Sequence, residues 1–225
     1  MAKNLTRRSF MAATGAAVAV SAIGAAGAAE MQEGVKILGI ACSYRKNKTT
    51  ATALRTALEA AREVSPKVEV ELIELGGMRI DGGIAAGNGG QDDFGQVQAK
   101  LAEPKVGGII VGTPIYFGNM SSLCKAFFER CMAVRQNWLL RNKVGGALAV
   151  GAARNGGQEF ALHSIHACLF AQDMIVVGDG RPFAHMGATL WNNAKDDIAQ
   201  DQWGMTIAKN LGRRVAEVAL KMAGR

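Results

Sequence analysis

The sequence predicts an α/β fold: a doubly wound parallel sheet between two layers of helices. From Val35 onward, short apolar runs rich in β-branched residues alternate with longer amphipathic segments, which is the pattern of β-α units around a parallel sheet. The short runs are too brief and too uniformly apolar for surface helices. Because crossovers between parallel strands are almost always right-handed, a chain of this length has two common strand orders.

Five strands and five helices follow from these patterns. The last helix carries an apolar residue at every third or fourth position, which indicates packing against the sheet. The strands are expected at Val35 to Ala41, Val68 to Leu75, Gly107 to Gly112, Val144 to Val150 and Met174 to Val177, and the helices at Thr49 to Val64, Phe94 to Ala102, Ser121 to Arg135, Gln158 to Phe170 and Gln202 to Met222.

Two connections are long for such a fold. Gly76 to Asp93 is rich in glycine, and Gly180 to Asp201 precedes the last helix without an obvious strand. Connections of this length are often functional or lie at interfaces. Asp92 with Asp93 is interpreted as a helix cap, and Asp196 with Asp197 as solvated surface.

The first 29 residues are interpreted as a twin-arginine export signal. Arg7 and Arg8 precede a stretch of Ala, Gly and Val that has no ionisable residue before Glu30, which is the arrangement of such signals. The alternative is an uncleaved membrane anchor, because about 20 apolar residues can cross a bilayer. We therefore expect residues 1–29 to be a signal peptide, residues 30–225 to be one domain, and the protein to be periplasmic.

The charge balance argues against nucleic-acid binding. The chain has 26 basic and 19 acidic residues, a net charge of +7. Three of the basic residues lie in the export signal, so the excess falls to +4 for the remaining domain. That excess is too small to predict a nucleic-acid groove.

Cysteine and histidine spacing predicts no metal site. The four cysteines have no C-x-x-C spacing, and Cys124 and Cys131 lie too far apart along one helix for a disulfide. We expect buried free thiols. His163 and His166 form a helical pair without a carboxylate partner, which is more often packed than metal-bound.

The turn after the first strand has the composition of a phosphate site. Residues 43–50 carry hydroxyl groups, basic side chains and an amide directly before a helix, and the N-terminus of a helix attracts anions. The turn lacks the G-x-x-x-x-G-K-[ST] pattern, and no G-x-G-x-x-G follows a strand. Triphosphate hydrolysis and a dinucleotide Rossmann site are therefore disfavoured.

Two further turns complete a pocket if the strand order is 2-1-3-4-5. The third strand ends in a glycine- and proline-shaped turn with Tyr116 and Phe117, and the fourth ends in the small-residue turn Gly151 to Glu159. In that order, the carboxyl ends of strands one, three and four are adjacent. A phosphate site beside an aromatic turn and a glycine turn suits a planar ring with a phosphorylated tail, and FMN is such a molecule.

Residues 36–50, 107–130 and 144–178 resemble the NADPH-dependent FMN reductase family of flavodoxin-like proteins, which includes iron–sulfur flavoproteins and quinone reductases. The most specific match is Gly112 to Ser121, GTPIYFGNMS. The resemblance implies a three-layer flavodoxin-like fold with five parallel strands in the order 2-1-3-4-5. Cys42 and Tyr44 depart from the family's usual Gly and Pro. The region Gly76 to Asp93 holds no cluster cysteines, so an iron–sulfur cluster is not expected.

By position, the resemblance implies that three groups of residues bind FMN. The first holds the phosphate, the second contacts the isoalloxazine and ribityl, and the third borders the ring from the other side. They are, in that order, Ser43, Arg45, Asn47, Thr49 and Thr50; Pro114, Ile115, Tyr116, Phe117, Gly118 and Asn119; and Arg154, Gly156 and Gly157.

The function expected from these features is an FMN-dependent oxidoreductase that passes electrons from NAD(P)H or another donor to a quinone, flavin or similar small acceptor. The chemistry would centre on the flavin, because no catalytic Ser/His/Asp set or carboxylate pair is evident. The alternative is an exported electron carrier fed by a protein or quinol partner at the membrane. A homodimer or homotetramer is expected, since relatives share flavin sites between subunits.

Overall fold

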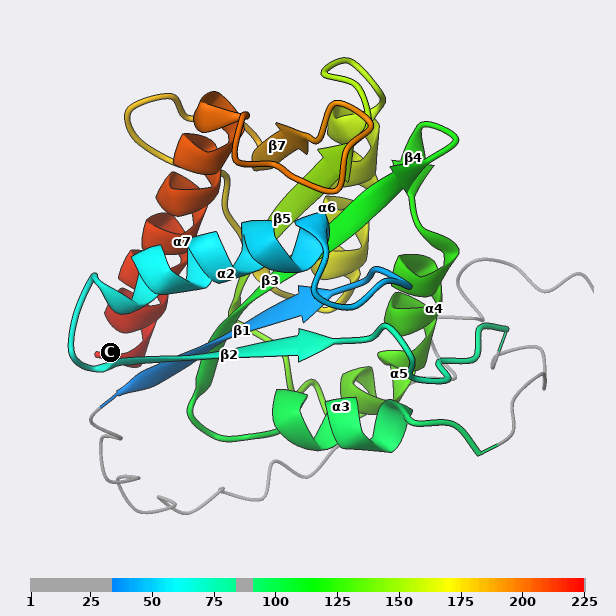
Figure 1. Cartoon of the computed structure of the whole chain (residues 1–225). Helices are drawn as coiled ribbons and strands as arrows, with labels where there is room; N and C mark the ends of the chain where they lie inside the picture. The colour runs from blue at the N-terminus through cyan, green and yellow to red at the C-terminus, as the bar shows by residue number, and fades with distance from the viewer. Residues whose placement is uncertain (1–33, 84–90, 225) are drawn as a thin grey trace, which may run out of the picture. The chain divides into compact units, whose positions relative to one another are not determined.

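The computed structural model describes residues 34–83 and 91–224. A parallel sheet runs through the domain in the order β2-β1-β3-β5-β6 (Figure 1), which corresponds to the predicted order 2-1-3-4-5. The export signal predicted at residues 1–29 lies outside the described residues. The strands of this path are β1 (Val35–Ala41), β2 (Val68–Glu74), β3 (Val106–Tyr116), β5 (Val144–Gly151) and β6 (Ile175–Val176).

Helices cover both faces of the sheet, each over a hydrophobic core. Neighbouring strand residues point to opposite faces: Ile37 packs into the core beneath α2 and α7, and Leu38 into the core beneath the other helices. The predicted three-layer architecture is confirmed. The helices are α2 (Thr49–Arg62) and α7 (Gln202–Ala223) on one face, with α3 (Phe94–Leu101), α4 (Ser122–Arg130), α5 (Met132–Arg135) and α6 (Gln158–Ala171) on the other.

The structure corrects two boundaries. The helix predicted at Ser121 to Arg135 is two helices, α4 and α5, which meet at Cys131. The third strand extends past Gly112 to Tyr116 and then folds back through a hairpin into β4 (Asn119–Met120). The aromatic turn predicted after the third strand is therefore the tip of this hairpin.

The edge strand of the sheet is split. β6 pairs with the beginning of β5, and a further strand, β7 (Ala188–Trp191), pairs with the end of β5. The sequence prediction of no strand between Gly180 and Asp201 was therefore wrong. The segment between β6 and β7 leaves the sheet and returns to it, and it lies against α7: a Cβ added at Gly180 would lie 3.2 Å from the Arg214 side chain.

The long connection before α3 is anchored by a buried ion pair. The Asp92 carboxylate accepts hydrogen bonds from Arg130 of α4 (2.8 Å) and from the N–H groups of Phe94 (3.1 Å) and Asp81 (3.0 Å). Of the predicted capping pair, only Asp92 bonds α3 through its side chain, at the N–H of the first helical residue; Asp93, the N-cap residue, makes no side-chain capping hydrogen bond. Asp92 also fixes the connection to α4. Within the described residues, no helix is long and apolar enough to span a membrane.

Candidate functional site

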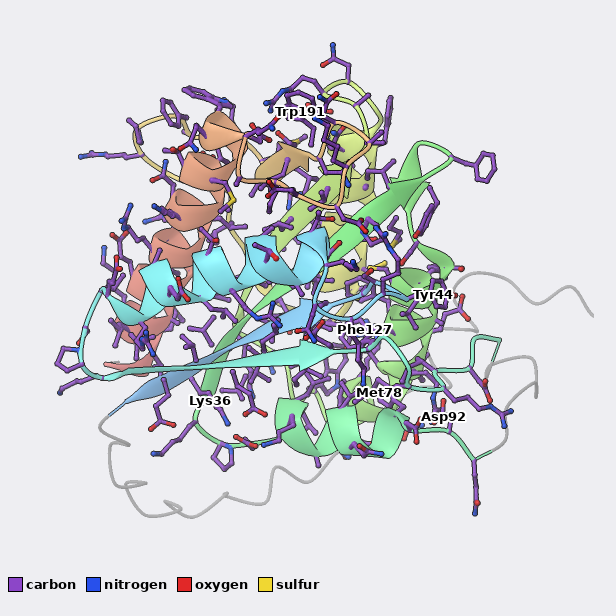
Figure 2. All side chains as sticks on the ribbon, viewed as in Figure 1. Lys36, Tyr44, Met78, Asp92, Phe127 and Trp191 are labelled. Atoms are coloured by element: carbon purple, nitrogen blue, oxygen red, sulfur yellow. The ribbon has the colours of Figure 1, made fainter. Side chains whose placement is uncertain are left out.

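The turns after β1 and β3 are joined by side-chain hydrogen bonds. The Ser121 hydroxyl donates to the Cys42 carbonyl (2.7 Å) and accepts from the N–H of Cys124 (3.1 Å), so it also caps α4. The Tyr44 hydroxyl lies 3.0 Å from the hydroxyl of Ser122, the first residue of α4. Figure 2 shows Tyr44 beside the beginning of α4. The two turns therefore share one edge of the site.

The turns after β3 and β5 touch through two glycines. Gly157 has a φ of +103°, and a Cβ added there would lie 2.6 Å from the Gly118 Cα. Only a residue without a side chain permits this backbone approach. The three turns that the sequence places at the carboxyl edge of the sheet are thus in contact with one another, as neighbouring parallel strands require.

The turn after β1 ends in a helix terminus without a side-chain cap. Lys48, the N-cap residue of α2, makes no capping hydrogen bond, and the first turn of α2 contains no acid. The N–H groups of Thr49, Thr50 and Ala51 have no acceptor in the described part of the chain. Uncapped N–H groups at a helix N-terminus bind phosphate well, so this terminus fits the phosphate of a flavin mononucleotide.

Asp196 lies against the basic side chains of the same turn. Its carboxylate pairs with Arg45 (2.7 Å) and Lys48 (3.2 Å). The hydrogen bonds from Lys48 and Arg45 hold the pKa of Asp196 below its ordinary value. Asp196 is exposed, as predicted, but it also pairs with the basic side chains of the predicted phosphate site.

The remaining predicted phosphate residues have structural partners. The Ser43 hydroxyl accepts from the N–H of Arg45 (3.2 Å). Asn47, at φ +55°, donates its N–H to Glu74 of β2 (2.7 Å) and accepts from Arg55 through its side chain. Asn47 thus braces the turn against β2. Thr49 and Thr50 are buried in the first turn of α2.

The hairpin after β3 presents flat apolar surface at the site. Pro114 and Ile115 are half-buried, whereas the side chains of Tyr116 and Phe117 are exposed, that of Phe117 completely. Asn119 accepts from the N–H of Met120 through its side chain (2.7 Å). Exposed rings on this hairpin suit the stacking of a planar cofactor.

A buried glutamine supports the turn after β5. Gln158 accepts from the N–H of Gly156 (2.8 Å) and donates to the carbonyls of Ala153 (2.6 Å) and Leu190 (3.1 Å). It therefore fixes the turn to β7. In the described residues, the N–H groups of Gly118 and Gly157 have no acceptor, which leaves backbone donors where the two turns meet.

Arg154 lies in the wall of a cavity of about 610 Å³. Its guanidinium pairs with Asp201, the N-cap residue of α7, and lies 5.3 Å above the ring of Trp191. The cavity adjoins the turn after β5 and is otherwise lined by α6, β7, α7 and residues 184–187. Sequence reasoning found neither Asp201 nor this cavity.

The cysteines do not form a metal site. Cys42, Cys124 and Cys131 are buried free thiols, and Cys168 is half-buried. Across residues 34–83 and 91–224, no group of three or more His, Cys, Asp or Glu side chains is placed to hold a metal. The residues present therefore do not fit an iron–sulfur cluster.

Comparison with known proteins finds related flavoproteins and a quinone dehydrogenase. Residues 35–189 match the model of the family described as NADPH-dependent FMN reductase. The chain is 39% identical over 191 residues to an iron–sulfur flavoprotein of Methanocaldococcus jannaschii, covering 82% of this chain and 97% of that protein. It is 32% identical over 201 residues to an NAD(P)H dehydrogenase (quinone) of Chromohalobacter salexigens, covering 81% and 95%.

Solved structures show the same fold at low sequence identity. A flavodoxin, WrbA-like protein from Agrobacterium tumefaciens superposes with a TM-score of 0.56 at 20% identity, over 84% of this chain and 98% of that one. A flavone reductase superposes with a TM-score of 0.63 at 21% identity, over 83% and 63%. These likenesses establish the flavodoxin-like fold.

Proposed function

The chain belongs to the NADPH-dependent FMN reductase family, and from this premise we propose that it oxidises NAD(P)H and reduces a quinone, a flavin or a similar small acceptor. It is an FMN-dependent oxidoreductase. The observation that carries the proposal is the contact among the three turns, made by Ser121 with Cys42 and by Gly157 with Gly118.

The residues at these turns divide the binding of FMN among them. The uncapped N-terminus of α2, with Thr49, Thr50 and Arg45, would hold the phosphate. The hairpin from Pro114 to Asn119 would support the ring, and Gly156 and Gly157 would border its other side. Bound FMN supplies the redox chemistry by accepting a hydride or electrons and passing them on.

The protein's contribution is orientation and electrostatics. The N–H groups of Gly118 and Gly157 point to backbone stabilisation of negative charge on the ring, which costs no reorganisation because both turns are fixed. Arg154 is held in place by Asp201 and Trp191 beside the same turn. It provides a positive charge for an anionic donor or acceptor.

Assembly and export are also proposed. The fully exposed ring of Phe117 at the edge of the site supports a homodimer or homotetramer in which a second subunit covers this edge. Arg7 and Arg8, before the uncharged stretch of the first 29 residues, support export by the twin-arginine route to the periplasm.

The export signal favours one alternative function. Nicotinamide cofactors are cytoplasmic, so an exported protein of this family would receive electrons from a protein or a quinol at the membrane. In that case the chain is an electron carrier, and its FMN site is unchanged.

Two measurements test the proposal. The purified protein is titrated with FMN and with riboflavin, which lacks the phosphate; FMN is expected to bind much more tightly because of the α2 terminus. The FMN-loaded protein is then mixed anaerobically with NADPH and with NADH. Rapid bleaching of the flavin absorbance supports the reductase, whereas an inert spectrum supports the carrier. Failure to bind FMN would refute both.

A further inference from the structure

A second cavity, of about 580 Å³, lies on the α7 side of the split edge strand. One wall is the segment from Asp179 to Ala184, which follows β6, and the other is formed by residues of α7 between Asn210 and Lys221. None of the three turns that form the predicted FMN site lines it. Its volume is in the range of cavities that hold small metabolites.

Two residues that line the cavity each hold a buried polar atom without a hydrogen-bond partner among residues 34–83 and 91–224. One is Oδ1 of Asp179, whose side chain is fully buried and whose other oxygen lies 3.3 Å from Nδ1 of His185. The other is Nδ2 of Asn210, in the middle of α7 and 7% exposed. Buried polar groups are almost always paired, because an unpaired one is costly.

The same cavity is rich in positive charge. Arg181, Arg213, Arg214 and Lys221 line it, against the carboxylates of Asp179 and Glu217. Arg181 and Lys221 form no ion pair with the described residues, and Arg214 reaches Glu217 only at 3.9 Å. Asn210, Arg214 and Lys221 follow one another at spacings of four and seven, so they lie on one face of α7.

These groups specify complementary parts of a ligand. Several guanidinium and ammonium groups favour a phosphate, which has more acceptor oxygens than one arginine can satisfy. An anion without hydroxyl groups does not suit the part of the cavity next to Asp179, because the Asp179 carboxylate would repel it. A hydroxyl group does, since it can both donate, as the Asp179 carboxylate requires, and accept, as the Asn210 amide requires.

We propose that this cavity binds a small phosphate ester that carries hydroxyl groups, with the phosphate on the arginines of α7 and a hydroxyl between Asp179 and Asn210. The site is separate from the flavin site. It does not depend on the redox activity proposed above.

The test is calorimetric titration of the full chain, with and without FMN, by three probes: ribose 5-phosphate, inorganic phosphate and ribose. With FMN bound, ribose 5-phosphate is expected to bind at one site, more tightly than either of the other two and without changing the flavin spectrum; without FMN, the free α2 terminus adds a second phosphate site. Asn210→Ala and Arg214→Ala should each weaken it by about tenfold or more, as for the loss of a hydrogen bond to a charged or buried polar group.

Lys209→Ala is the matched control. Lys209 is an exposed cation on the same helix that does not line the cavity, so its removal should leave binding unchanged. Arg214 is partly exposed, so its variant tests the site even if Asn210→Ala does not fold, which thermal melting would reveal.

The proposal is overturned if ribose 5-phosphate shows no saturable binding, or if inorganic phosphate binds equally well. The proposal is also overturned if Lys209→Ala loses as much affinity for ribose 5-phosphate as Arg214→Ala, because binding would then reflect the overall charge. Since the titration is also run without FMN, failure of the flavin proposal would leave this result readable.

Discussion

The guanidinium of Arg45 lies 2.7 Å from the carboxylate of Asp196, a residue 151 positions further along the chain. The same carboxylate also pairs with Lys48, so Asp196 partly neutralises both cations beside the N-terminus of α2. A phosphate bound there would have to compete with this carboxylate.

Asp196→Asn is therefore expected to tighten FMN binding, by about two- to fivefold at low salt, which is the range of exposed ion pairs. The dissociation constant is measured by flavin fluorescence at two salt concentrations, and the gain should shrink at high salt. Asp197→Asn, which changes a neighbouring acid that accepts from the N–H of Ala199, is the control. Weaker binding in Asp196→Asn would instead show that Asp196 positions the cations.

Gly157→Ala is expected to destabilise the protein and weaken FMN binding, because its methyl group would collide with Gly118 in a backbone conformation of positive φ. Gly118→Ala separates the two causes: Gly118 has φ +76° but open space around it. The Gly118 variant should lose about 1 kcal/mol from backbone strain, and the Gly157 variant more. Equal losses in chemical unfolding would mean that the two turns do not need their close contact.

Ser121→Ala should lower the free energy of unfolding by about 1–3 kcal/mol, because it removes the α4 cap and leaves the Cys42 carbonyl without its donor. Ser122→Ala removes only the exposed contact with Tyr44 and should cost far less. FMN affinity is measured on both variants. If Ser121→Ala binds FMN as well as the wild type, the junction of the two turns is not required for the site.

The Asp92–Arg130 pair predicts a pH dependence of stability. Burial raises the pKa of Asp92, but the hydrogen bonds from Arg130 and from the N–H groups of Asp81 and Phe94 outweigh it and hold the pKa below its ordinary value. The stabilisation is therefore present above about pH 4, the unfolded value, and is lost as pH falls through the lower folded value.

Arg130→Met should accordingly be strongly destabilised at pH 7, where it leaves a buried carboxylate unpaired, and much less at pH 3. In Asp92→Asn, the free energy of unfolding should depend less on pH in the acid range than it does in the wild type. The free energies are measured by urea unfolding at pH 7 and pH 3. A destabilisation of Arg130→Met that is the same at both would exclude an electrostatic origin.

The sequence was sufficient for the main sheet because its strands are apolar runs or, in β2, alternate apolar and acidic residues; even the two residues of β6 lie in the apolar run Met174 to Val177. β7 was missed because Ala188–Trp191 is short and contains Ala and Thr among its apolar residues, so only pairing with β5 makes it a strand. The break between α4 and α5 was missed because the apolar pattern continues through Cys131.

Parts of the site were predictable for a similar reason. The turns follow strands whose order places them side by side, so their meeting could be expected. Asp196 and Asp201 could not be found in this way: each acts on a turn far away in the sequence, and nothing in their local surroundings distinguishes them from surface polar residues. Gln158 braces its own turn, but its bond to Leu190 of β7 is equally invisible in the sequence. Their partners are fixed only by tertiary packing.

The division of the edge strand has a consequence for local stability. β3 and β5 have eleven and eight residues and carry the turns proposed for the flavin, whereas β6 and β7 have only two and four. Short edge pairings open at lower free energy than central strands, so amide hydrogens should exchange fastest along β6 and β7. β7, which lines the first cavity, and the segment between β6 and β7, which lines both cavities, would then be more adaptable than β3 and β5, the platform for the redox centre.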